Sequence, residues 1–299
     1  MLYLVTVSTM VCIYIILASG LNIITGYAGQ PNLGHAAFFG IGAYASALLT
    51  TKVGLSFWAA MPLAVVIAAS VGFVLGIISL RLREDFLAIT TIGVNFVVVS
   101  VFLYFDYFGR ALGLGGIPRP SIFGHVLNKP EYLVLVVFLV AAVLLVCWVF
   151  SRSRLGLMVS AVREDELAAH SLGLNVTALK LAAFVFGTAL AGLGGSVYAH
   201  FMTFISPYDF AFPVSITVMC MVVLGGAGTF WGPVVGAIIL ASAPEIMRFI
   251  QQYRMLIYGG LLAVLMIFQP AGLLGADSVF VRGGARLVAR VRGRVVQSG

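Results

Sequence analysis

The chain has 299 residues, of which 62% are hydrophobic and only 9% are charged. Soluble domains usually carry about 25% charged residues, so this composition excludes an ordinary soluble protein and indicates a polytopic membrane protein. The formal net charge of +7 could suggest a nucleic-acid partner, but five arginines lie in the tail, where they favour a cytoplasmic position beside anionic headgroups. They are Arg282, Arg286, Arg290, Arg292 and Arg294.

Hydrophobic runs dominate the chain from its start. The first run has no basic residue and is too long for a secretory signal, so it predicts a retained span. A helix needs about 20 apolar residues to cross a bilayer. That rule predicts an all-α polytopic membrane protein with about nine spans, within a range of eight to ten. The predicted spans are residues 2–25, 32–50, 57–80, 86–105, 132–150, 178–201, 211–226, 231–249 and 255–270.

Charge in the loops predicts the orientation. An odd number of spans places the two ends on opposite sides, and the basic tail belongs in the cytoplasm. This topology leaves eleven Lys and Arg residues in cytoplasmic segments and six outside, with an external N-terminus. We therefore expect a transmembrane domain over residues 1–275, with a cytoplasmic loop at 151–176, and a basic cytoplasmic tail over residues 276–299.

Two glycine-rich stretches interrupt the apolar runs. They read GYAGQPNLGHAAFFGIGAY at 26–44 and LGGAGTFWGPVVGA at 224–237. Glycine lets a backbone unwind, and broken backbone at membrane depth occurs only where protein or a water-filled cavity surrounds it. Their similarity suggests a weak internal repeat, and such paired segments often mark the central site of a transporter. Chance similarity is the alternative, because the chain has 34 glycines.

Polar side chains at membrane depth are candidates for lining a pathway: Asn22, Gln30, Asn32, His35 and Asn95. Such a side chain more often makes a hydrogen bond between helices than a contact with a substrate. His35 is the first choice because it follows the broken stretch, although it could simply pin that loop. The three cysteines, Cys12, Cys147 and Cys220, lie in apolar stretches without ligand spacing, so we expect buried side chains and no metal site.

Two polar connections precede the fifth predicted span. Charged residues at 81–85 predict a tight cytoplasmic turn. The external segment 106–131 is too polar and too rich in proline to span. It is either a surface beneath a docking partner or an ordered loop that closes the outer rim.

Ser151–Asn175 is the only long, charge-dense run inside the chain. It predicts a cytoplasmic helix of roughly four turns at 157–172, ended by a glycine C-cap at Gly173 with Leu174 as the following apolar residue. Asn175 or Thr177 can then cap the next span.

Four consecutive charged residues, Arg163 to Glu166, would surround the axis of that helix, and Arg163 could pair with Glu166 at i,i+3. A helix that is polar all round favours a partner protein or solvent. An ordinary charged loop is the alternative.

Several stretches together resemble the second (M-type) membrane subunit of ABC importers for branched-chain amino acids. In chain order they are GLNIITGYAGQPNLGHAAFFGIGAY, LRLREDFLAITTIG, GGIPRP, SRLGLMVSAVREDELAAHSLGLNV, ISPYDF, VVLGGAGTFWGPVVGA and FQPAGLLG. The resemblance runs from about Leu21 to Gly275. It implies that residues 1–275 form a permease domain and that 151–176 is its coupling loop.

In importers of this kind, a loop with an EAA-then-glycine pattern forms a coupling helix that sits in a cleft of the ATPase. Ala168, Ala169 and Gly173 fall at the matching positions, whereas Leu167 occupies the glutamate position and Glu166 is displaced by one. Which acid meets the ATPase therefore stays open. The residues implied in coupling are Arg163, Glu164, Asp165, Glu166, Ala168, Ala169 and Gly173.

The resemblance also implies the partners. A homologous H-type permease would share the pathway, two ATP-binding cassette subunits would sit below, and an external binding protein would deliver an aliphatic amino acid. ATP and Mg would be bound by the ATPase subunits, so this chain would hold no cofactor and no catalytic residue. The location implied is a bacterial inner membrane, without a nucleic-acid partner.

Other functions are weighed against this one. The chain has no G-x-x-x-x-G-K-[ST] loop, so it is not its own P-loop ATPase. Its carboxylates fall at predicted span ends or outside spans, which disfavours an ion-coupled secondary transporter of a small polar solute. Sodium can bind through backbone carbonyls, so that alternative stays open. A channel is a further alternative, but it would not need the charged loop. The substrate also stays open, because related permeases carry urea or short amides.

Overall fold

The computed structural model describes residues 2–79, 84–122, 124–246, 259–260 and 272–274. The long helices are α1 (Leu2–Leu21), α2 (His35–Thr51), α3 (Phe57–Ser79), α4 (Glu84–Tyr104), α5 (Lys129–Arg152), α8 (Val176–Met202), α9 (Phe212–Gly225) and α10 (Gly232–Ile246). A π-helix, η1 (Asn22–Tyr27), continues α1, and two short helices, α6 (Arg154–Glu164) and α7 (Glu166–Ser171), follow α5. The all-α class is confirmed for the described residues.

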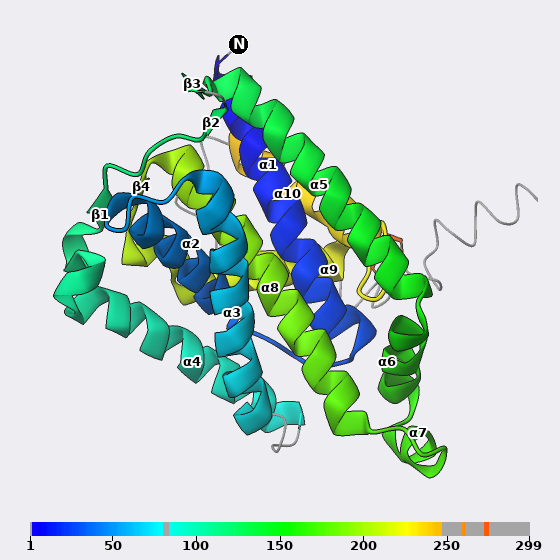
Figure 1. Cartoon of the computed structure of the whole chain (residues 1–299). Coiled ribbons are helices and arrows are strands. Elements are labelled where there is room, and N and C mark those ends of the chain that lie inside the picture. The colour runs from blue at the N-terminus through cyan, green and yellow to red at the C-terminus, as the bar shows by residue number, and fades with distance from the viewer. Residues whose placement is uncertain (1, 80–83, 123, 247–258, 261–271, 275–299) are drawn as a thin grey trace, which may run out of the picture.

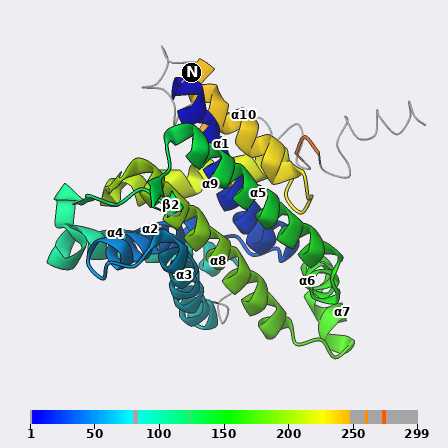
Figure 2. The ribbon, with the colours of Figure 1, turned by 45° about the horizontal axis from the view of Figure 1, so that its top comes forward.

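Helix α8 lies at the centre of the bundle, where it packs against α1, α2 and α3. Both ribbon views place α2, α3 and α4 on one side of it and α1, α5 and α10 on the other (Figures 1 and 2). Among the described residues, six helices are long and apolar enough to cross a membrane, and they coincide with the predicted spans 2–25, 57–80, 86–105, 132–150, 178–201 and 211–226. Their apolar residues face both the core and the surface, as a bilayer requires.

The predicted count of nine spans is not confirmed. The second predicted span, 32–50, forms α2, which has 17 residues and buries most of its side chains against other helices. It is short because the polar, glycine-rich stretch before His35 does not join the helix. The eighth, 231–249, forms α10, whose apolar part covers Gly232–Ser242. The ninth, 255–270, and the tail at 276–299 lie outside the described residues, apart from Gly259 and Gly260. Of the turn predicted at 81–85, residues 81–83 also lie outside them, whereas Glu84 and Asp85 begin α4 and so are not part of a turn.

Glycines let the central helices touch. A Cβ atom on Gly195 of α8 would lie 2.6 Å from the backbone nitrogen of Ala43 in α2. Real Cβ atoms do not approach backbone so closely, so a side chain here would push α2 away from α8.

We therefore expect Gly195→Val to destabilise the folded bundle by at least about 3 kcal/mol, because overpacking against backbone leaves no room to relax. Thermal unfolding of the detergent-solubilised protein measures the loss. Gly93→Val in α4 is the matched control, since a Cβ there has no described heavy atom within 4 Å. Equal melting temperatures for the two variants would contradict the close packing of α2 and α8.

Residues 106–131 form an ordered cover over one end of the bundle. They contain the short helices η2 (Asp106–Phe108) and η3 (Arg110–Leu112) and the strands β1 (Leu114–Gly115), β2 (Ser121–Ile122) and β3 (His125–Val126). β1 pairs antiparallel with β4 (Phe204–Ile205), and β2 pairs with β3. His200 of α8 links this cover to α2, since its ring bonds the Pro118 carbonyl at 2.7 Å and the Ser46 hydroxyl at 3.0 Å. The structure thus supports an ordered loop that closes this end.

Candidate functional site at the glycine-rich turns

The first helix breaks where the sequence predicts. α1 runs into the π-helix η1, and the chain leaves η1 through a loop before α2 begins at His35. The Ala28 amide donates to the Ile23 carbonyl at 3.1 Å, and the Gln30 amide donates to the Ile24 carbonyl at 3.0 Å. Gly29 has a φ of +69°, which a side chain would disfavour. π-helical turns are rare and are frequent at functional sites.

The loop between η1 and α2 lies inside the bundle. The Leu33 amide donates to the Thr91 hydroxyl of α4 at 3.1 Å, and the Ala36 amide donates to the Ser215 hydroxyl of α9 at 2.9 Å. Thr91 is seven residues from the start of α4, which is about 10 Å along an ideal helix. The broken backbone therefore reaches well away from the end of the bundle, between helices that supply its hydrogen bonds.

The five predicted lining residues all lie buried, at 0–3% exposure. Two of them make hydrogen bonds to the backbone of other segments. The Asn95 amide donates to the Phe210 carbonyl at 3.2 Å. Asn22 donates to the Thr229 carbonyl at 2.9 Å and accepts from the Gly228 amide at 2.8 Å. Asn22 therefore joins η1 to the turn at 226–229, and Asn95 joins α4 to Phe210 through its amide nitrogen.

The other three, and Asn95 at its amide oxygen, carry buried polar atoms without a well-formed hydrogen bond to any described residue. These atoms are both ends of the Gln30 amide, both ring nitrogens of His35, the amide nitrogen of Asn32 and the Oδ1 of Asn95. The His35 ring lies beside the Leu17 carbonyl of α1, and the Asn32 oxygen accepts from the Gly34 amide at 3.0 Å. An unsatisfied buried polar group costs about 1–3 kcal/mol, so several on one loop need an explanation.

The predicted single helix at 157–172 is wrong. Asp165 breaks it with an extended backbone, at φ −157° and ψ 108°. Its carboxylate accepts from the amides of Leu167 and Ala168, at 2.9 and 3.0 Å, so Asp165 is the N-cap of α7. Aspartate gains more from capping free amides than from the interior of a helix. The charges at 163–166 therefore do not surround one axis.

The predicted pair between Arg163 and Glu166 is also wrong. Glu166 pairs with Lys180 of α8, and the Arg163 guanidinium donates to the Gly26 carbonyl. The break at Asp165 places the two side chains on different helices, so the i,i+3 geometry is lost. Each charge instead fixes its short helix to the transmembrane bundle.

The predicted end of the loop is confirmed. Gly173 has a φ of +80°. Its amide donates to the His170 carbonyl at 2.9 Å, and the Leu174 amide donates to the Ala169 carbonyl at 3.1 Å, which is a Schellman motif. The Asn175 side chain then accepts from the Ala178 amide at 3.1 Å and caps α8.

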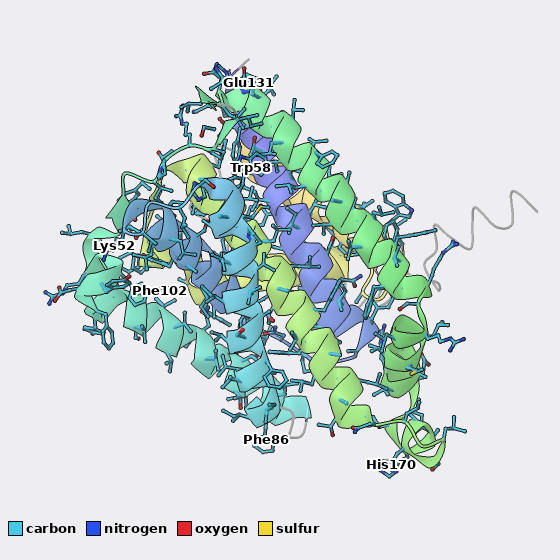
Figure 3. The ribbon with its side chains drawn as sticks, in the orientation of Figure 1. Lys52, Trp58, Phe86, Phe102, Glu131 and His170 are labelled. Atoms are coloured by element: carbon cyan, nitrogen blue, oxygen red, sulfur yellow. The ribbon has the colours of Figure 1, made fainter. Side chains whose placement is uncertain are left out.

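Helix α7 projects from the bundle. Its His170 and the Phe86 side chain near the start of α4 lie at one end of the molecule, and Glu131 lies at the other (Figure 3). Glu164, Asp165, Glu166 and Ala168 are exposed, whereas Ala169 is buried. Sequence reasoning missed the apolar surface here: Leu167 is 82% exposed and Leu172 is 81% exposed. The available signal was a leucine on a short helix outside the spans, Leu167, and a second at its C-cap, Leu172.

The two glycine-rich stretches meet at this end of the bundle. We call the group of Asn22, Gly26, Arg163, Gly228 and Thr229 the turn junction. Asn22 bonds both Gly228 and Thr229, and Arg163 bonds Gly26. The amides of Leu273 and Leu274 add a further layer by donating to the carbonyls of Leu224 and Gly225, each at 2.9 Å. The contact is a finding, whereas the internal repeat stays a prediction.

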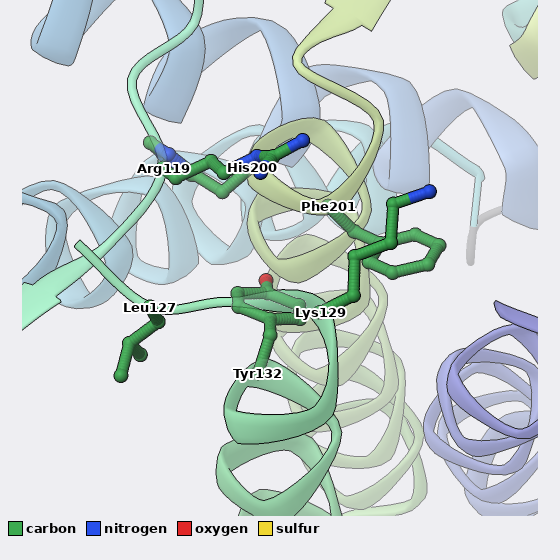
Figure 4. Close-up of a pocket in the computed structure, with 6 residues that line it drawn as sticks. All are labelled: Arg119, Leu127, Lys129, Tyr132, His200 and Phe201. Carbon is green, nitrogen blue, oxygen red and sulfur yellow. The ribbon is translucent and has the colours of Figure 1, made fainter. Parts of the chain in front are cut away.

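A separate pocket lies at the opposite end. Six residues from the segment before α5, the start of α5 and the end of α8 line it (Figure 4): Arg119, Leu127, Lys129, Tyr132, His200 and Phe201. The Tyr132 hydroxyl donates to the Val197 carbonyl at 2.7 Å, and His200 bonds Ser46 and Pro118. These polar groups fix the wall of the pocket, and the two cations are exposed at its rim.

Membrane-length helices around a broken helix, with a helical loop projecting from one end, define a polytopic membrane protein of the transporter type. Over residues 3–268 the chain matches the family described as the permease component of branched-chain amino acid transport systems. The chain belongs to this family.

Its relatives include both kinds of permease. The chain is 39% identical to the high-affinity branched-chain amino acid transport system permease protein LivM of Salmonella typhimurium and to that of Escherichia coli, with 90% of this chain and 69% of each relative covered. It is 26% identical to the permease protein LivH of E. coli, with 89% of this chain and 92% of the relative covered. No solved structure matches the chain.

Proposed function

We propose that this chain is a membrane-spanning permease subunit of an ABC importer. With a homologous H-type permease it forms the path for branched-chain amino acids, two separate ATPase subunits drive it, and an external binding protein delivers the substrate. Family membership and the 39% identity to LivM proteins support the transport of branched-chain amino acids. The similarity to LivH supports pairing of two related permeases.

The observation that carries the coupling role is the exposed helix α7. Leu167 and Leu172 present apolar surface away from the bundle, and Glu164 and Asp165 are exposed beside them. A charged rim around buried apolar anchors is the usual composition of a protein interface. In this proposal the ATPase subunits bind ATP and Mg, and Leu167, Leu172 and Ala168 of this chain enter the ATPase cleft. Ala169 packs inward and Gly173 ends the helix.

The charge distribution supports a bacterial inner membrane with the α6–α7 loop inside. The tail arginines and the loop residues Arg152, Arg154 and Arg163 then share the cytoplasmic side, as the positive-inside rule requires. The N-terminus faces outward, and the cover over residues 106–131 faces the binding protein.

Three side chains are the candidates for the path itself: Gln30, Asn32 and His35. Their unsatisfied polar atoms can bind water or the polar groups of a passing amino acid, at a place where the backbone is already broken. Asn22 is a poorer candidate, since both ends of its amide bond the backbone. Asn95 ranks below the three loop residues because it lies on the intact helix α4 and its amide nitrogen bonds the Phe210 carbonyl, although its oxygen has no described partner.

Reconstitution tests the function. In proteoliposomes that contain both permeases, both ATPase subunits and the binding protein, we expect ATP to drive uphill uptake of radiolabelled leucine. Omission of ATP should lower uptake to the level of empty vesicles, even with a proton or sodium gradient. Gradient-driven uptake without ATP would instead establish a secondary transporter, and ATP-driven uptake of urea or short amides but not leucine would correct the substrate.

A further inference from the structure

Arg163 points away from the surface that α7 offers to a partner. It lies in the last turn of α6, and although it is accessible from the surface, its guanidinium turns inward and donates to the Gly26 carbonyl. The aliphatic part of the Arg163 side chain passes Gly29, and a Cβ atom added to Gly29 would lie 3.0 Å from the Arg163 Cγ. A Cβ atom on Gly228 would collide with the guanidinium. Arg163 therefore fills a space that exists because both turns carry glycine.

The Gly26 carbonyl attracts the guanidinium because of its place at the end of a helix. Gly26 lies in the last turn of the continuous α1–η1 helix, where carbonyls lack partners within the helix. A cation is stabilised at a helix C-terminus, and a hydrogen bond from a charged donor is stronger than a neutral one. The interaction therefore fixes α6 to the inner end of the first membrane helix.

The same arginine reaches both glycine-rich turns. Gly29 has a φ of +69° and Gly228 a φ of +81°, so both turns depend on glycine for their backbone as well as for space. Asn22 ties the turn at 226–229 to η1, one residue after the end of α1. Any displacement of α6 is thus applied to two turns that are already bonded to each other.

The first of these turns leads directly to the candidate path. Gln30 follows Gly29, Asn32 lies in the same loop and His35 is the first residue of α2, all with unsatisfied polar atoms. On the far side, Thr91 of α4 bonds the loop at the Leu33 amide, and Ser215 of α9 bonds the first turn of α2 at the Ala36 amide. Movement of the turn at 26–29 against these fixed points would change the position of the polar side chains between them.

We propose that Arg163 is the positioning residue that transmits movement of the α6–α7 loop to the two glycine-rich turns, 26–29 and 226–229. It acts by holding Gly26, and it is not part of the surface that meets the ATPase. The proposal rests on the proposed function, and it deepens it by naming the link between the ATPase-facing helix and the path.

The test compares Arg163→Ala with Arg154→Ala in the full reconstituted transporter. Both residues are exposed arginines on α6. Arg163 lies in the last turn and bonds the Gly26 carbonyl, whereas Arg154 lies at the start of the helix. For Arg163→Ala we expect the leucine transported per ATP hydrolysed to fall at least about tenfold, the effect of losing one charge-assisted hydrogen bond. ATPase subunits should co-purify within about twofold of wild type, and Arg154→Ala should stay within about twofold in both measurements.

Two further variants separate positioning from folding. Arg163→Lys should recover the transport ratio to within about threefold of wild type, since an ammonium can still donate to the Gly26 carbonyl. Gly228→Ala should lower the ratio about fivefold by displacing the guanidinium. Gly54→Ala is its control, because Gly54 has a similar φ of +76° but no described heavy atom within 4 Å of a Cβ.

Several results would overturn the proposal. They are a wild-type transport ratio in Arg163→Ala or in Gly228→Ala, loss of ATPase co-purification in Arg163→Ala, and failure of Arg163→Ala to insert while Arg163→Lys inserts normally. The second would place Arg163 in the ATPase interface, and the third would give it a folding role. If the wild-type protein takes up leucine without ATP, the proposed function itself is refuted. If its uptake requires ATP but Arg163→Ala transports as much leucine per ATP as wild type, only this inference is refuted.

Discussion

Uphill leucine uptake is expected to fall at least about 100-fold when Arg163, Glu164, Asp165 and Glu166 are all replaced by alanine, since every 1.4 kcal/mol of lost coupling is a factor of ten. Asp165 caps α7 through two amides, and such a cap contributes about 1 kcal/mol. Glu166 binds Lys180, and Arg163 binds Gly26. The hydrogen bond from the charged Arg163 contributes about 1.5–3 kcal/mol and the surface pair of Glu166 with Lys180 about 0–1 kcal/mol, so the loop would lose both its shape and its attachments.

The measurement is uptake per inserted permease, with the amount in the membrane determined separately. Arg154→Ala, in the same loop, is the control. It removes an exposed charge at the start of α6, and such surface substitutions usually change stability by no more than about 0.5 kcal/mol. Normal uptake by the quadruple variant would show that this loop does not couple transport to ATP hydrolysis.

Asn22→Leu is expected to destabilise the folded permease by up to about 6 kcal/mol, because two half-buried backbone groups would each lose their partner. Asn22 is 3% exposed, and its amide satisfies the Thr229 carbonyl and the Gly228 amide together. Leucine has nearly the same shape but offers neither a donor nor an acceptor.

The loss can be followed as the folded fraction during titration with a denaturing detergent. Ser70→Ala is a suitable control, because the exposed Ser70 hydroxyl bonds only the Val66 carbonyl of its own helix among the described residues. We expect its midpoint to stay near that of wild type. An Asn22→Leu protein as resistant as the control would mean that the turn junction does not hold α1 to the turn at 226–229.

Much of the architecture follows from local sequence. Six spans were predictable because a bilayer demands long apolar segments with internally bonded backbone, whatever their neighbours are. The C-cap at Gly173 was also predictable from local sequence, because its bonds connect residues a few positions apart. The Gly173 amide bonds the His170 carbonyl, and the Leu174 amide bonds the Ala169 carbonyl. The helix break at Asp165 had a local signal too, but cap preference and helix propensity compete there, and composition does not decide between them.

The sequence by itself determined the membrane class, the glycine-rich breaks and the charged loop, because these depend on hydropathy, backbone freedom and charge along the chain. Only the tertiary structure decided that α2 is a short enclosed helix and that Asn22 bonds Thr229, 207 positions away. It also decided that Arg163 turns to the Gly26 carbonyl, 137 positions away, and not to Glu166. The physical reason is that a side chain pairs with whichever group the fold brings within reach. The distance between groups far apart along the chain cannot be predicted from local sequence.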